Sequence, residues 1–189
     1  MFRILSVCLI LIIADLGIAQ EKKDVIEWSN ERLTWNDFQG TPLTSSNFIA
    51  VSAGKISVSP ITSEVTLSNE VHLTVRALFY KKKSWSITNS KEILKHEQLH
   101  ADIRELYARL IRKKLLEKAV YGSREDAQKR IDLVYSELDK KMRKTQGEYD
   151  DETDHSMNKK SQQEWDEKIA IQLEGLKEYT DTELTITIK

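Results

Sequence analysis

Hydrophobic and polar residues follow two different periods along the chain, one in each half. In the first half they alternate, and residues 71–79 (VHLTVRALF) place Val, Leu, Val, Ala and Phe on one face. Such an alternation predicts a half-buried β-strand. Residues 50–58 and 64–67 predict two further strands here, and residues 182–188 predict a late return to the sheet as an edge strand.

From Ser90 onward the apolar residues recur with the 3.6-residue period of a helix. Ser90 and Ser123 are suitable N-caps for a first helix that ends near residue 120 and a second over about 124–145. The spacing predicts a third helix over about 158–178, and the polar residues 147–155 predict a loop before it. A small N-terminal antiparallel sheet followed by a helical half predicts a single α+β domain.

The first twenty residues predict an export signal. Arg3 is followed by an apolar run over residues 4–13 and by small residues at 17–19, the pattern of a cleaved signal peptide. A retained membrane anchor is the alternative. We therefore expect an exported protein, periplasmic or secreted, in which residues 21–189 form the domain. The single cysteine, Cys8, lies within the signal, so a metal in the mature protein must be held by His, Asp or Glu.

Charge excludes one class of partner. The chain has 29 Lys and Arg against 30 Asp and Glu, and no basic stripe is interleaved with aromatic residues, so we expect no nucleic-acid partner. The charges alternate along the helices, a pattern typical of solvated faces. Glu105 and Arg109 have the i, i+4 spacing of an ordinary surface ion pair. The sequence leaves the oligomeric state open.

The first predicted helix contains an HExxH motif, residues 96–100 (HEQLH). Residues i and i+4 of a helix share one face, so His96 and His100 can bind the same Zn²⁺ ion. Glu97 then projects beside the metal, where it can accept a proton from an activated water. The motif predicts a zinc metallopeptidase-like site with Glu97 as the catalytic base.

The two histidines interrupt an otherwise apolar stripe on this helix. The stripe has helical spacing and consists of Ile93, His96, His100, Ile103, Tyr107 and Leu110. Burying an imidazole without a partner costs on the order of 1–3 kcal/mol. A shared metal would remove that cost. The alternative is two satisfied core histidines beside a solvated glutamate.

A catalytic zinc needs a third protein ligand. The extended HExxHxxGxxH pattern is absent because Ile103 and Leu106 stand where it has Gly and His, and a glutamate further along the chain is one alternative. His155 is the only histidine downstream and is the favoured third ligand. The neighbouring Asp150, Asp151 and Glu152 are alternatives. Tyr149 is a candidate to donate its phenol to a developing oxyanion.

Several segments together resemble a bacterial family of exported proteins of uncharacterised function that are labelled secreted zinc-dependent proteases. The most specific segments are the HEQxH motif at 96–100 and the YDxxTxH motif at 149–155. Further matching segments are residues 31–42 (ERLTWNDFQGTP), Ser84-Trp85, Gln162 and Trp165. The resemblance implies that His96, His100 and His155 bind the metal and that Glu97 is the base.

We therefore expect an exported zinc metallopeptidase that acts on a peptide or protein in the cell envelope or outside it, without stable membrane insertion after signal cleavage. One alternative is a non-enzymatic module, stabilised by a metal site, that binds an envelope partner. Another is a metal-dependent hydrolase of a different substrate class. The sequence does not specify the substrate or the cleavage position.

Overall fold

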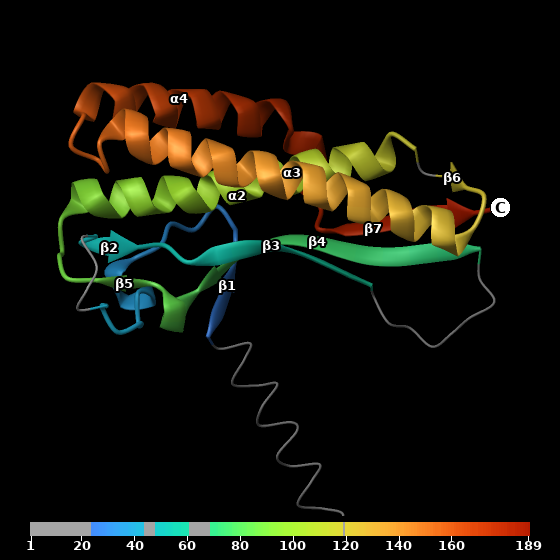
Figure 1. Ribbon diagram of the computed structural model, residues 1–189, viewed down its shortest axis with the longest axis horizontal. Helices are drawn as coiled ribbons and strands as arrows, with labels where there is room; N and C mark the ends of the chain where they lie inside the picture. The colour runs from blue at the N-terminus through green and yellow to red at the C-terminus, as the bar shows by residue number, and fades with distance from the viewer. Residues whose placement is uncertain (1–23, 44–47, 61–68, 119) are drawn as a thin grey trace, which may run out of the picture.

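The computed structural model of the chain describes residues 24–43, 48–60, 69–118 and 120–189. It has an α+β fold in which three helices cover one face of a five-stranded sheet (Figure 1), as the sequence predicts. The predicted export signal at residues 1–20 and the predicted strand at 64–67 lie outside the described residues. None of the helices in the described part of the chain combines the length and apolar character needed to cross a membrane.

The main sheet is built around one long strand, β4. Its strands are β1 Val25–Glu27, β3 Gly54–Pro60, β4 Glu70–Tyr80, β6 Val120–Tyr121 and β7 Glu183–Ile188. Strand β3 pairs with one edge of β4, and β7 and β1 share the other edge, all antiparallel. Strand β6 then pairs with β7 in parallel. The predicted edge position of β7 is therefore wrong, because β7 lies between two strands.

The alternation in β4 separates a buried face from a polar one. Leu73, Val75 and Phe79 point into the core and are at most 3% exposed. His72 and Arg76 lie on the opposite face, where His72 contacts Glu70 and Arg76 makes an ion pair with Glu27. An antiparallel sheet with one packed and one solvated face shows this pattern.

A second sheet of two strands, β2 Ala50–Val51 and β5 Trp85–Ser86, lies beside the main one. The single strand predicted for residues 50–58 is thus divided between β2 and β3. The break falls at Ser52 and Ala53, where side chains satisfy part of the backbone. The Ser52 carbonyl accepts from Arg104 and the Ala53 N–H donates to Ser84 Oγ, while the Ala53 carbonyl accepts from the Tyr80 N–H of β4.

The helices are α2 Lys91–Leu116, α3 Arg124–Thr153 and α4 Lys159–Gly175, with 3₁₀ turns η1 Trp35–Asp37, η2 Lys81–Lys83 and η3 Lys177–Tyr179. Ser90 and Ser123 are the N-caps of α2 and α3, as predicted, and each side chain accepts a hydrogen bond from a backbone N–H of the first turn. Helix α3 is longer than predicted. Residues 147–153 are helical, so most of the predicted loop is the last two turns of α3.

Helix α2 is the centre of the molecule. It lies between the sheet and the other two helices (Figure 1) and contacts β3, β4, α3 and α4. It is therefore buried on nearly all sides, including positions that carry charged residues. The prediction of one apolar stripe and a solvated opposite face describes this helix incompletely.

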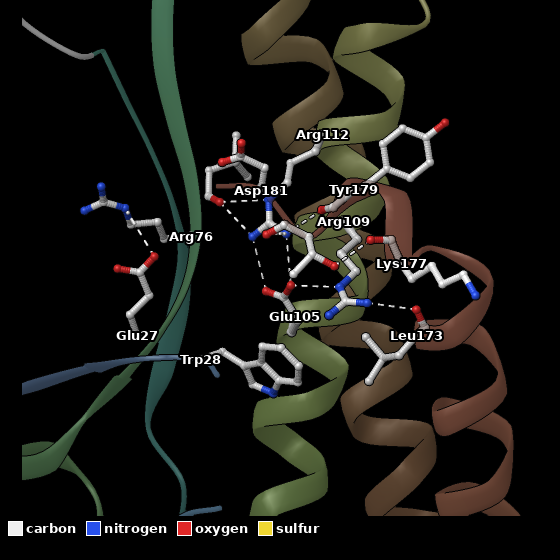
Figure 2. A network of polar contacts seen from close by, with 12 residues as sticks. Glu27, Trp28, Arg76, Glu105, Arg109, Arg112, Leu173, Lys177, Tyr179 and Asp181 are labelled. Atoms are coloured by element: carbon white, nitrogen blue, oxygen red, sulfur yellow. Dashed lines mark hydrogen bonds and ion pairs between the residues drawn. The ribbon is translucent and has the colours of Figure 1, made fainter. Parts of the chain in front are cut away.

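The predicted surface pair of Glu105 and Arg109 is part of a buried network (Figure 2). Arg112 is 0% exposed, and its guanidinium contacts both Glu105 carboxylate oxygens and donates to the carbonyl oxygens of Val75 and Tyr179. The network therefore joins α2 to β4 and to the turn that leads into β7. The i, i+4 spacing correctly predicted the ion pair of Glu105 and Arg109, but the prediction that this pair lies on the surface is wrong.

Candidate metal centre and pocket

The HExxH motif lies in the first half of α2, where the sequence predicts it. His96 is 3% exposed, and the imidazole rings of His96 and His100 lie 4.9 Å apart between centroids. Both rings point toward the last turns of α3, where Asp150 approaches them. The Asp150 Oδ1 atom lies 3.1 Å from Nε2 of His96 and 3.0 Å from Nε2 of His100. Two side chains from successive turns of α2 and one from the end of α3 thus meet at a single point.

The other nitrogen of each imidazole is held by a glutamine. His96 Nδ1 lies 3.1 Å from Oε1 of Gln162 in α4, and His100 Nδ1 contacts Oε1 of Gln146 in α3. The amide orientation is fixed, because Gln162 Nε2 donates to Asp166 and Gln146 Nε2 donates to the backbone carbonyl of His100. An amide oxygen can only accept, so Nδ1 carries a hydrogen on both rings and Nε2 faces Asp150.

This arrangement requires positive charge between the three side chains. With Nδ1–H on each ring, two neutral imidazoles would direct their Nε2 lone pairs at a carboxylate oxygen, and three acceptors would repel one another. Protons on the histidines or a bound cation resolve the conflict. The ligand atoms of His96, His100 and Asp150 all lie within 4.8 Å of one another. Two imidazoles and a carboxylate, each imidazole oriented by an outer hydrogen bond, are a donor set that fits zinc.

The electrostatics of the site agree with that requirement. Burial alone would raise the pKa of Asp150, but hydrogen bonds from His100 and His96 hold it well below its usual value. Burial would lower the pKa of His100, but the hydrogen bond to Asp150 and the charge of Glu97 raise it. The carboxylate therefore remains charged and attracts a proton or a metal ion into the position beside it.

Glu97 lies at the same site, on the wall of a pocket of about 490 Å³ that His96, His100 and Asp150 also line. Glu97 is 5% exposed, and burial raises the pKa of its carboxyl group. A carboxylate with a raised pKa is a better proton acceptor than an exposed one at neutral pH. Glu97 thus lies where it can exchange a proton with a molecule bound in the pocket.

His155, the predicted third ligand, lies on the turn after α3. The residues Asp154, His155 and Ser156 all have positive φ, at 47°, 48° and 79°, which reverses the chain between α3 and α4. His155 lines the same pocket with a half-exposed side chain, and its Nδ1 lies 3.8 Å from Asp150 Oδ1. The structure therefore brings Asp150, one of the alternatives, against the two motif histidines and places His155 next to it.

Tyr149 lies beside the motif histidines, on the side of the site that faces the protein interior. Its ring stacks on His96 at 4.5 Å between centroids, and its hydroxyl donates to Gln162 Oε1 at 2.8 Å. The side chain is fully buried, burial raises its pKa, and it is not among the residues that line the pocket. Tyr149 therefore supports the His96 imidazole. An oxyanion donor, the role predicted for Tyr149, would need its hydroxyl to face the pocket, and this hydroxyl does not.

Sequence reasoning missed the two glutamines that orient the histidines. Gln162 is one of the residues that carry the family resemblance, but its sequence position does not show which side chain it contacts. Gln146 stands four residues before Asp150, the spacing of one helix face, and is recognisable only once α3 is known to continue to Thr153.

Arg104 is the remaining buried charge near the site. Its guanidinium donates to the carbonyl and hydroxyl oxygens of Ser52, on the pocket wall, and burial lowers its pKa to about 10. Glycine is required at residue 54, because a Cβ there would lie 2.7 Å from Arg104 Nε and 2.1 Å from the Leu78 carbonyl oxygen. Arg104 thus fixes the segment after β2, whose Ser52 lines the pocket, against α2.

Comparison with known proteins gives one match. No curated protein and no solved structure matches the chain. One family model matches residues 59–156, just over half of the chain, and this segment includes His96, Glu97, His100, Asp150 and His155. The chain therefore belongs to the family described as "Bacterial protein of unknown function (DUF922)".

Proposed function

We propose that this protein is an exported zinc-dependent metallopeptidase. The observation that carries the proposal is the convergence of His96, His100 and Asp150 on one point, with Glu97 on the wall of the same pocket. An outer glutamine holds each imidazole so that its Nε2 atom faces the Asp150 carboxylate, the orientation that three ligands of one metal ion need. Export is proposed from the signal sequence predicted at residues 1–20.

In this proposal His96, His100 and Asp150 hold the zinc ion. When bound, zinc would polarise a peptide carbonyl and lower the pKa of a water molecule toward about 7. Glu97 accepts the proton of the attacking water and then transfers it to the nitrogen of the leaving amine. Gln146 and Gln162 keep the imidazole Nε2 atoms directed at the ligand position, and Tyr149 supports the ring of His96.

The metal content of single variants tests the ligand set. We expect about one zinc ion per wild-type chain by elemental mass spectrometry, and a loss of at least about a hundredfold in affinity when Asp150 is replaced by alanine, because a direct ligand is removed. His155→Ala should retain zinc, since Asp150 supplies the third ligand. The purified wild-type protein should also cleave unstructured peptides, and chelation should stop the cleavage.

Two outcomes would contradict this assignment. Zinc lost from His155→Ala but retained by Asp150→Ala would restore His155 as the third ligand. Wild-type protein that binds zinc, melts earlier after chelation, yet cleaves no peptide would favour the alternative of a metal-stabilised binding module.

The outer glutamines give a further prediction. Gln162→Met keeps the side-chain volume but removes the acceptor for His96 Nδ1–H, so we expect zinc affinity to fall about 10- to 100-fold with the fold intact. Competition with a chelating dye measures the affinity, and circular dichroism checks the fold. Gln163→Met is the matched control, because the neighbouring Gln163 is exposed and bonds only to Glu167 among the described contacts. Equal affinities in the two variants would show that the glutamine does not orient the ligand.

A further inference from the structure

Three large apolar side chains are exposed around the pocket that holds the HExxH motif. Phe48 is 52% exposed, Ile49 is 45% exposed and Met157 is 73% exposed, and all three line the pocket. Exposed apolar residues that occur singly need no explanation, but a group of them at the edge of a polar site indicates a binding surface. The three come from two separate segments, the one that enters β2 and the turn after α3.

The apolar group lies close to the proposed metal position. Phe48 packs edge-on against the His155 ring at 5.4 Å between centroids, and His155 Nδ1 is 3.8 Å from Asp150 Oδ1. Met157 follows His155 by two residues, so it lies on the same turn. A substrate whose reacting carbonyl reaches Asp150 and the two motif histidines would therefore place a neighbouring side chain against this group.

The charged residues of the pocket restrict what that side chain can be. Among the described residues that line it, Glu97, Asp150 and Asp154 are acidic and none is lysine or arginine. An acidic substrate side chain beside Phe48 and Met157 would share the pocket with Asp154, a like charge, and the buried Arg104 is already bonded to Ser52. Because Phe48, Ile49 and Met157 expose apolar surface at the pocket, a bulky aliphatic or aromatic side chain gains the most from burial there.

We propose that this protein selects peptides that carry a bulky apolar side chain next to the reacting bond, and that Phe48, Ile49 and Met157 form the subsite for it. This inference rests on the proposed peptidase function, because only a peptidase would have a peptide bond that reacts. Recognition of the side chain itself requires only binding, so it can be tested without turnover.

The test measures binding of three fluorescent hexapeptides that differ only in a central pair, Leu-Leu, Asp-Asp or Lys-Lys, flanked by glycines. The protein is the zinc-loaded Glu97→Gln variant, so that the peptides remain uncleaved, and the readout is fluorescence anisotropy. We expect the Leu-Leu peptide to bind about tenfold more tightly than either of the others. Adding Met157→Ser should weaken its binding about tenfold and leave the other two peptides unchanged.

Ile171→Ser is the matched control for Met157→Ser. Ile171 has the same 73% exposure, lies on α4 and is not among the residues that line the pocket. Neither substitution should affect folding, because both side chains are largely exposed. Equal weakening in the two variants, or a preference for the Asp-Asp or Lys-Lys peptide, would overturn the proposal.

The failure of this inference can be told from the failure of the proposed function. If wild-type protein cleaves no peptide but the Leu-Leu preference and its dependence on Met157 are observed, the apolar subsite is supported and the peptidase activity is not. If wild-type protein cleaves all three peptides at equal rates and Met157→Ser changes no affinity, the peptidase stands and the subsite is refuted.

Discussion

Replacing Glu97 with glutamine is expected to lower peptide hydrolysis by about 10²- to 10⁴-fold while leaving zinc bound. Glutamine keeps the size and one carbonyl oxygen of the side chain, but it cannot accept the proton of the attacking water. Glu97 is not one of the three proposed ligands, so the metal content should remain near one ion per chain. Peptide cleavage and elemental analysis on the same preparation measure both quantities.

In the zinc-free protein, the same variant should be at least as stable as the wild type at neutral pH. Burial raises the pKa of Glu97 above its unfolded value, so the ionised form is disfavoured in the folded protein. The native state therefore loses stability as the pH rises through that pKa, and a neutral glutamine removes this loss. Thermal unfolding at pH 5 and pH 8 measures the effect, and the gain should be larger at pH 8.

Glu92→Gln provides the control on the same helix. Glu92 lies in the first turn of α2, is exposed, and accepts a hydrogen bond from Ser90. Its replacement should leave cleavage unchanged. Full activity in Glu97→Gln, or an equal loss in the two variants, would exclude Glu97 as the base.

The second large effect concerns stability. Arg112→Met is expected to lower the free energy of unfolding by about 3–5 kcal/mol, because it removes one partner of a buried ion pair. The carbonyl oxygens of Val75 and Tyr179 lose donors at the same time, and among the described residues Glu105 keeps its ion pair with Arg109. Methionine fills most of the volume, so the loss would come from unpaired polar groups more than from a cavity. Urea unfolding measures it.

Arg143→Met is the control for the loss of an arginine. Arg143 also makes a two-pronged contact, with Asp139, but its side chain is 74% exposed, so water replaces the lost contacts. We expect a much smaller change in unfolding free energy. Similar losses of unfolding free energy in the two variants would show that the buried Arg112 network stabilises the fold no more than an exposed ion pair does.

The parts of the fold that the sequence predicted are those where local pattern and tertiary environment agree. Strand β4 alternates because one face is packed and the other is solvated, and the N-caps Ser90 and Ser123 bond within their own first turns. The end of α3 was missed for the opposite reason. Gln146, Tyr149, Asp150 and Thr153 do have helical spacing, but most of them are polar, and a search for apolar periodicity does not detect a polar face that is buried.

The candidate site shows the same limit. The HExxH motif specifies its own geometry, because two histidines four residues apart on a helix must share a face. The third group depends on how α3 packs against α2. Asp150 and His155 are neighbours in sequence and both reach the pocket, but only the packing of the last helical turns brings the Asp150 carboxylate within 3.1 Å of the imidazole nitrogens. Sequence alone cannot resolve that difference.

The position of β7 has a consequence for the order of folding. Strand β7 is the last of the described elements to leave the ribosome, yet it lies between β4 and β6 and carries Ile186, which is 0% exposed. Until residues 183–188 are synthesised, β4 has an open edge and the core lacks one of its walls. Contacts between distant segments form slowly because long loops must close first. The sheet and the core of a nascent chain of this design are therefore completed only when residues 183–188 have been synthesised.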